Sequence, residues 1–129
     1  MRNILIADPI ENGLKVAKQE LNDAGFTVDT SLNHENTLKK IKENNYFLVF
    51  IELLEIEKSH ELCKSIKCIN ENIFVVLIAT AANPNKVVIQ MNKFLDNGGI
   101  EEYLRKPLIE NDLVYVAQKL YNKNLNNLK

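Results

Sequence analysis

The chain has 129 residues, which is enough for one domain with its own hydrophobic core. Apolar residues make up 46% and charged residues 26%, and 16 basic against 17 acidic residues give a net charge of −1, so no global field attracts nucleic acid or an anionic membrane. No apolar run approaches the roughly 18–20 residues of a membrane span, and no signal-peptide core precedes Asp8. These features predict a cytoplasmic protein that binds neither membrane nor nucleic acid directly.

The first half of the chain alternates between buried strands and helices. Residues 3–8 form a continuous apolar run that ends in an acid, and residues 11–24 carry an apolar stripe at helical spacing. A strand is expected at 26–30, a short helix at 34–44, and the most apolar and therefore central strand at 46–51.

The second half repeats the pattern. A helix is expected near 58–69, a fully buried strand at 73–80, and a helix at 84–97 that begins near a proline and ends at two glycines. A short strand follows at 101–105, and a last helix starts near Glu110.

Strands that are apolar throughout are buried on both faces, as in a parallel sheet covered by helices. The sequence therefore predicts a three-layer α/β domain with five strands and five helices. The domain is expected to span residues 1–122, with a helix end or flexible tail at 123–129.

The cysteines and histidines give no sign of a metal site. Cys63 and Cys68 lie in one predicted helix, roughly 140° apart around its axis, so they are expected to be free, buried thiols. His34 and His60 lack the companion residues of a zinc site.

Polar residues end or directly follow four of the predicted strands. They are two acids, a hydroxyl and an amine: Asp8, Glu52, Thr80 and Lys106. In open parallel sheets ligands bind beyond the carboxyl ends of the strands, so these side chains are expected to converge on one edge. The nucleotide-binding and hydrolase motifs GxGxxG, GxxxxGK[ST] and GxSxG are absent from the sequence.

The segments "ILIADP", "YFLVFIEL", "LIATA" and "GGIEEYLRKPL" resemble those of response-regulator receiver domains of two-component signalling, over residues 3–121. The resemblance implies a flavodoxin-like (βα)5 fold and a signalling module rather than an enzyme. By this resemblance, Asp8 matches the first acid of the family's acidic pocket. Thr80 and Lys106 match the residues that contact the phosphoryl group, and Tyr103 matches the aromatic switch residue. The peptide bond before Pro107 is usually cis in the family.

Two positions depart from the family pattern. Pro9 stands where a magnesium-binding acid belongs, and Glu52 stands where the phosphoacceptor aspartate belongs. Phosphoryl transfer to a carboxylate needs a nucleophile in line and a divalent cation, and the added methylene moves the Glu52 oxygens by on the order of 1 Å, enough to matter for the rate. We therefore expect a pseudo-receiver without a catalytic residue or cofactor. Mg²⁺, held by Asp8 and Glu52, is expected only if residual activity remains.

Two interpretations of Glu52 stay open. In one, a pair between Glu52 and Lys106 holds the strand ends in one state without phosphate. In the other, Glu52 only neutralises the lysine and stabilises the fold.

If the pocket is not phosphorylated, the function lies in a binding surface. Helical spacing places Ile89 and Tyr115 on the outer faces of their helices, beside Tyr103, while Glu101 and Glu102 are expected to be solvated. The expected partner is a histidine kinase, an output protein or a second copy, bound through the helix at 84–97, the strand at 101–105 and the last helix.

The prediction is thus an atypical receiver domain that acts by protein–protein interaction. Two alternatives remain: an active phosphoacceptor receiver with residual Mg²⁺ dependence, and a flavodoxin-like domain that binds a small anion or nucleotide.

Overall fold

The computed structural model describes residues 2–8, 13–53, 56–79 and 99–127, and the single positions 89, 92, 93 and 96. Within these residues strands and helices alternate from residue 3 to residue 79, as the apolar pattern predicts, and a strand and a helix follow from residue 102 onward.

Five parallel strands form one sheet in the order β2-β1-β3-β4-β5, so the most apolar predicted strand lies at its centre. The strands are β1 (Asn3–Ala7), β2 (Thr27–Ser31), β3 (Leu48–Leu53), β4 (Phe74–Ala79) and β5 (Glu102–Arg105). The three-layer α/β architecture and the five-stranded parallel sheet are therefore confirmed.

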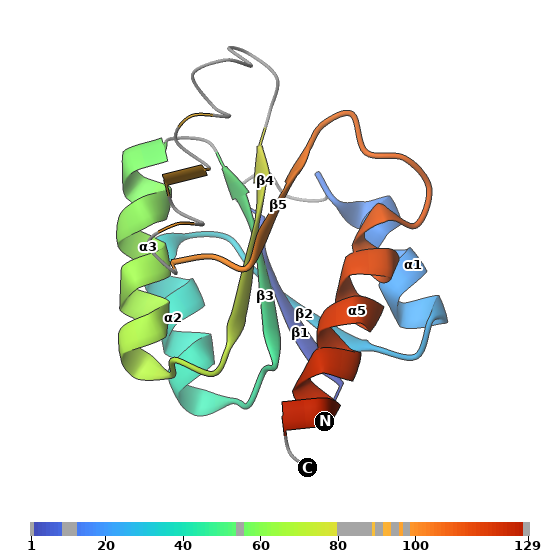
Figure 1. Ribbon diagram of the computed structural model, residues 1–129, viewed down its shortest axis with the longest axis horizontal. Coiled ribbons are helices and arrows are strands. Elements are labelled where there is room, and N and C mark those ends of the chain that lie inside the picture. The colour runs from blue at the N-terminus through green and yellow to red at the C-terminus, as the bar shows by residue number, and fades with distance from the viewer. Residues whose placement is uncertain are drawn as a thin grey trace.

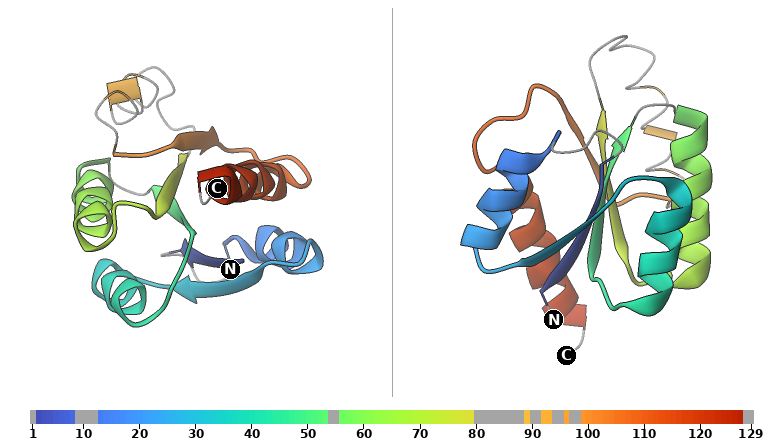
Figure 2. Two further views of the ribbon diagram at one scale, coloured as in Figure 1. Left: turned by 60° about the horizontal axis from the view of Figure 1, so that its bottom comes forward. Right: turned by 180° about the vertical axis from the view of Figure 1, so that it is seen from behind.

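In the described part of the chain, four helices cover the two faces of the sheet, α1 and α5 on one side and α2 and α3 on the other (Figures 1 and 2). They are α1 (Lys15–Asp23), α2 (His34–Glu43), α3 (Ile56–Ile69) and α5 (Asp112–Asn127). The helix predicted at 84–97 lies outside the described residues except at positions 89, 92, 93 and 96. Helix α5 continues through the first part of the predicted tail, to Asn127.

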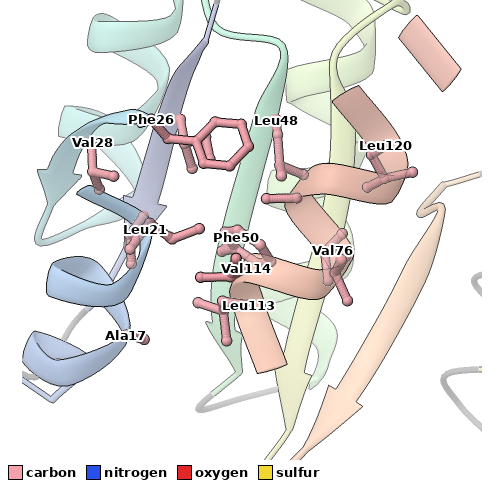
Figure 3. Close-up of a cluster of buried hydrophobic side chains, with 14 of the residues drawn as sticks. Ala17, Leu21, Phe26, Val28, Leu48, Phe50, Val76, Leu113, Val114 and Leu120 are labelled. Atoms are coloured by element: carbon pink, nitrogen blue, oxygen red, sulfur yellow. The ribbon is translucent and has the colours of Figure 1, made fainter. Parts of the chain in front are cut away.

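Each face of the sheet has its own hydrophobic core, because successive residues of a strand point to opposite faces. Ile4 and Ile6 of β1 join the core under α1 and α5, whereas Leu5 and Ala7 join the core under α2 and α3. In the first core, side chains of α1 and α5 close over Phe50, which is fully buried (Figure 3).

Strand β3 has the same length as the predicted run at 46–51 but is shifted by two residues, because it begins at Leu48 and ends at Leu53. Glu52 is therefore inside the strand, paired with Ile78 of β4, and is not the first residue after it. This register carries the carboxylate into a buried position between two apolar strands.

At the opposite end of the sheet, aromatic rings from the residues just before β2 and β3 pack against the last helix. The rings of Phe26, Phe47 and Tyr121 all contact one another. The Arg2 guanidinium lies 4.9 Å from the centroid of Phe26 and 4.8 Å from that of Tyr121. A cation over an aromatic face is attracted by the ring's quadrupole.

Both cysteines are free, but only one is buried as expected. Cys63 faces the core, and desolvation by burial raises the pKa of its thiol to about 12. Cys68, five residues later on α3, is exposed, so the prediction of two buried thiols is wrong for Cys68. None of the helices in the described part of the chain is long and apolar enough to cross a membrane.

The Phe50→Ala substitution is expected to destabilise the domain by about 3–5 kcal/mol, because it leaves a cavity in the core under α1 and α5. Urea unfolding followed by circular dichroism measures this. Val16→Ala, at an exposed position of α1, is the control and should change stability little. Equal effects of the two substitutions would contradict the assignment of Phe50 to the core.

Candidate functional site

Glu52 is the buried acid at the carboxyl end of the central strand. Glu52 as a whole is only 3% exposed, because β1 and β4 flank β3 and helices cover both faces of the sheet. A carboxylate in such a place must be paired, hydrogen-bonded or protonated.

Lys106 supplies the partner. Its backbone N–H donates to Ala79 O at 2.9 Å, which extends the pairing of β5 with β4 by one step and brings the lysine to the same edge as Glu52. Lys106 Nζ donates to Glu52 Oε1 in an ion pair. The Lys106–Pro107 peptide bond is cis. The lysine side chain remains 29% exposed, so one member of the pair stays in contact with water.

Asp8 is the second buried acid of the site. It follows β1, and its backbone N–H donates to Ser31 O at 2.9 Å, so β1 and β2 hold it in place. Its Oδ2 accepts from the backbone N–H of Leu14 at 3.0 Å, just before α1 begins. The strand ends thus bring Asp8, Glu52 and Lys106 to one edge of the sheet, the convergence that the sequence predicts.

The pKa of Glu52 is raised above its ordinary value of 4.5. Burial away from water is the largest cause, the ion pair with Lys106 opposes it, and the nearby Asp8 carboxyl adds to it. Glu52 Oε2 is buried and accepts no hydrogen bond from the described residues. The lysine therefore compensates only part of the cost of keeping this carboxylate charged.

Two other site residues, Pro9 and Thr80, lie outside the described residues. Tyr103, the expected switch residue, is half-buried in β5 and packs against the core under α2 and α3. Its ring therefore lies against the protein and not out in solvent.

The two candidate interface residues are both exposed, Ile89 at 58% and Tyr115 at 69%. Lys119, one turn along α5, lies with its Nζ 6.0 Å from the Tyr115 ring centroid and forms an ion pair of 2.7 Å with Glu102 of β5. Glu102 keeps 29% of its side chain exposed, so it is a partly solvated acid that also ties β5 to α5.

Glu101 is the residue whose role the sequence conceals. It is half-buried, it pairs with Lys67 of α3 at 2.5 Å, and its Oε2 accepts from the backbone N–H of Val75. Glu101 thus joins the start of β4 to α3, and the prediction that it is solvated is wrong. No local motif marks this role, since its partners lie 26 and 34 residues away.

The donor set of the site fits a divalent cation poorly. The described residues contain no group of three or more His, Cys, Asp or Glu side chains that could hold a metal ion. Of the two carboxylates at this edge, Glu52 already pairs with a lysine, whose positive charge would repel a metal ion there.

Neither a protein-family model nor a curated protein sequence matches the chain. Among solved structures, a CheY-like response regulator receiver domain protein from Methanospirillum hungatei JF-1 superposes with a TM-score of 0.82 at 21% identity, over 98% of both chains. A two-component response regulator from Clostridium difficile gives 0.78 at 27% identity, over 95% of this chain and 97% of that one. Our chain has the fold of a response-regulator receiver domain.

The receiver fold is shared with proteins of other descriptions. A structure described as adenylate cyclase from Rhodopirellula baltica gives a TM-score of 0.82 at 17% identity, over 95% of this chain and 89% of that one. In the receiver fold of our chain, the acids and the lysine stand at the carboxyl edge of the sheet, the edge where open α/β folds bind ligands.

The Glu52→Gln substitution is expected to raise the melting temperature at neutral pH by a few degrees. A raised pKa means that the folded state binds a proton more readily than the unfolded state, so the stability contributed by Glu52 falls as pH rises from about 4.5 through the higher folded-state pKa. Glutamine does not titrate, and the exposed end of Lys106 can be solvated by water. The advantage of the variant should therefore grow with pH and vanish in acid.

Thermal unfolding at a series of pH values measures this difference. Glu61→Gln, at an exposed position of α3, is the matched control and should leave the pH profile of stability unchanged. A Glu52→Gln protein that is less stable than the parent at pH 7 would show instead that the ion pair is net stabilising.

Proposed function

We propose that the chain is an atypical receiver domain of signal transduction that acts through protein–protein contacts and is not phosphorylated in the usual way. The observation that carries the proposal is the ion pair between Glu52 and Lys106. Lys106 matches the lysine that contacts the phosphoryl group in receiver domains, and here it pairs with Glu52, which replaces the phosphoacceptor aspartate.

Three features of the pocket oppose ordinary phosphorylation. The Glu52 carboxylate has one oxygen on Lys106 and the other buried, so neither oxygen is exposed to a phosphodonor among the residues that the structure describes. Pro9 replaces one potential metal ligand with a ring that has no N–H. Without a cation, the negative charges of the phosphoryl oxygens, Asp8 and Glu52 repel one another.

The same pair supports a constitutive role. A glutamate reaches farther than an aspartate from the same strand, so its charge approaches Lys106 without a phosphate between them. The half-buried Tyr103 is consistent with a receiver held in one state. We therefore propose that the Glu52–Lys106 pair replaces the phosphorylation signal and fixes the surface that a partner binds.

The surface proposed for this partner is formed by the region of residue 89, β5 and α5. Tyr115 and Ile89 offer apolar contact area there, and the ion pair between Glu102 and Lys119 holds β5 and α5 together beside Tyr115. Aromatic side chains are enriched at protein interfaces. The partner is a histidine kinase, an output protein or a second copy of the chain, in the cytoplasm.

The parent protein is expected not to respond to Mg²⁺ with beryllofluoride, or to a small phosphodonor. Amide NMR shifts of Leu14 and Lys106 report on the site from both sides of the pocket, and intact-mass spectrometry detects an added phosphoryl group. A saturable, Mg²⁺-dependent shift in the parent would instead support the alternative of an active receiver.

A double variant provides the positive control for this experiment. Pro9→Asp with Glu52→Asp restores both acids of the family pattern and is expected to gain a Mg²⁺-dependent response to beryllofluoride, because a shorter carboxylate releases Lys106. Failure of the double variant to respond would show that more than these two side chains blocks the site.

Replacing Tyr115 with aspartate is expected to weaken self-association, because it puts a charge into an apolar contact. Sedimentation velocity over a range of concentrations measures this, with Val16→Asp on α1 as the control outside the proposed surface. A parent protein that stays monomeric throughout would exclude the second copy as the partner and leave the other two.

A further inference from the structure

A cavity at the outer edge of the sheet adjoins the strand-end site, and Asp8 borders both. It has a volume of about 530 Å³ and is bounded by α1 on one side and by the end of β2 and the start of α2 on the other. Figure 2 shows α1 and α2 on opposite sides of the edge strand β2. Small-molecule sites in proteins are typically ~300–1,000 Å³ in volume, so this cavity is of suitable size.

Three lysines from two different helices line the cavity: Lys15 and Lys18 of α1, and Lys40 of α2. Neither Lys15 nor Lys18 forms an ion pair with the described residues. Lys40 Nζ donates to the backbone carbonyl of Thr30, which places the ammonium group at the edge of β2 and leaves two of its N–H donors for another acceptor.

The charge of the lining is strongly unbalanced. Asp8 is the one acid among the described residues that line the cavity, and its side chain is buried and engaged by the N–H of Leu14. Three positive charges therefore stand against one negative charge at the inner end. The imbalance is local, since the whole chain has a net charge of −1.

Neutral polar groups and apolar side chains complete the lining. Asn22 and Asn36 offer amide donors from α1 and α2, while Ile6 and Leu14 give a buried apolar floor. Leu32, just after β2, is 53% exposed and extends this apolar surface outward. A few polar groups around an apolar floor are typical of sites that bind small organic molecules.

We propose that this cavity binds a small organic phosphate, namely a phosphate ester with two negative charges and an apolar or aromatic group. A single carboxylate would need only one of the three lysines, whereas a phosphate dianion accepts hydrogen bonds from several ammonium groups at once. The apolar floor accommodates the organic part, and the amides bind its polar edges. The anion lies at the outer end with the lysines, away from Asp8.

This cavity shares Asp8 and Leu14 with the strand-end site, but its cations are different. Its cations are Lys15, Lys18 and Lys40, whereas Lys106 and Glu52 do not line it. Substitutions of these lysines leave Glu52 and Lys106 unchanged, so failure of either proposal leaves the other standing.

The test uses adenosine monophosphate as the phosphate ester and pyrophosphate as the bare anion, titrated into the parent protein and followed by amide NMR. Saturable shifts are expected at Lys15, Lys18 and Lys40, with tighter binding of adenosine monophosphate because it also covers the apolar floor. Adenosine alone is expected to bind far more weakly. The absence of saturable shifts with both anions up to millimolar concentration would overturn the proposal.

Paired variants separate a specific site from general charge attraction. Lys15→Gln with Lys18→Gln is expected to weaken binding of adenosine monophosphate about tenfold or more, because it removes charge-assisted hydrogen bonds. Lys39→Gln with Lys42→Gln removes the same charge from exposed positions of α2 that do not line the cavity, and it should keep the affinity nearly unchanged. Equal losses in the two double variants would overturn the proposal, and circular dichroism verifies that both remain folded.

Discussion

A charged group enclosed at the centre of a parallel sheet determines the arrangement of the rest of this site. Glu52 lies on β3 between two apolar strands, where its carboxylate loses most of its contact with water. Its counterion must come from another strand, and β5 supplies it because Lys106 follows the last residue of that strand at the same edge. Removing a buried charge from water costs several kcal/mol per ion, so the position of Lys106 matters as much for folding as for any function of the pocket.

Much of this arrangement is predictable because both faces of the sheet are covered. Strands such as "IFVVLIA" are apolar at every position, which distinguishes them from strands with one solvent-exposed face. The parallel order then brings the carboxyl ends of the strands together, so Asp8, Glu52 and Lys106 could be grouped before their contacts were known. The register was harder to predict, since an apolar run does not reveal that β3 continues through Glu52 to Leu53.

The residues that escaped prediction act through partners far away in the sequence. The polar side chain of Glu101 looks like that of any solvated acid, and only the packing of α3 beside β4 gives it Lys67 and the Val75 N–H. The cation stacking of Arg2 between Phe26 and Tyr121 depends in the same way on residues from both halves of the chain. Spacing rules describe one helix or strand at a time, so contacts between elements are beyond their reach.

The contrast between the two cysteines has a practical consequence. The sulfur of Cys63 is enclosed in the core, and its raised pKa keeps it as an unreactive thiol at neutral pH, whereas Cys68 is open to solvent on the same helix. A maleimide dye or a spin label would therefore attach to one native position, near the end of α3 that is far from the pocket edge (Figure 1). The unaltered sequence thus provides a spectroscopic reporter in which no residue of the fold or the site has to be changed.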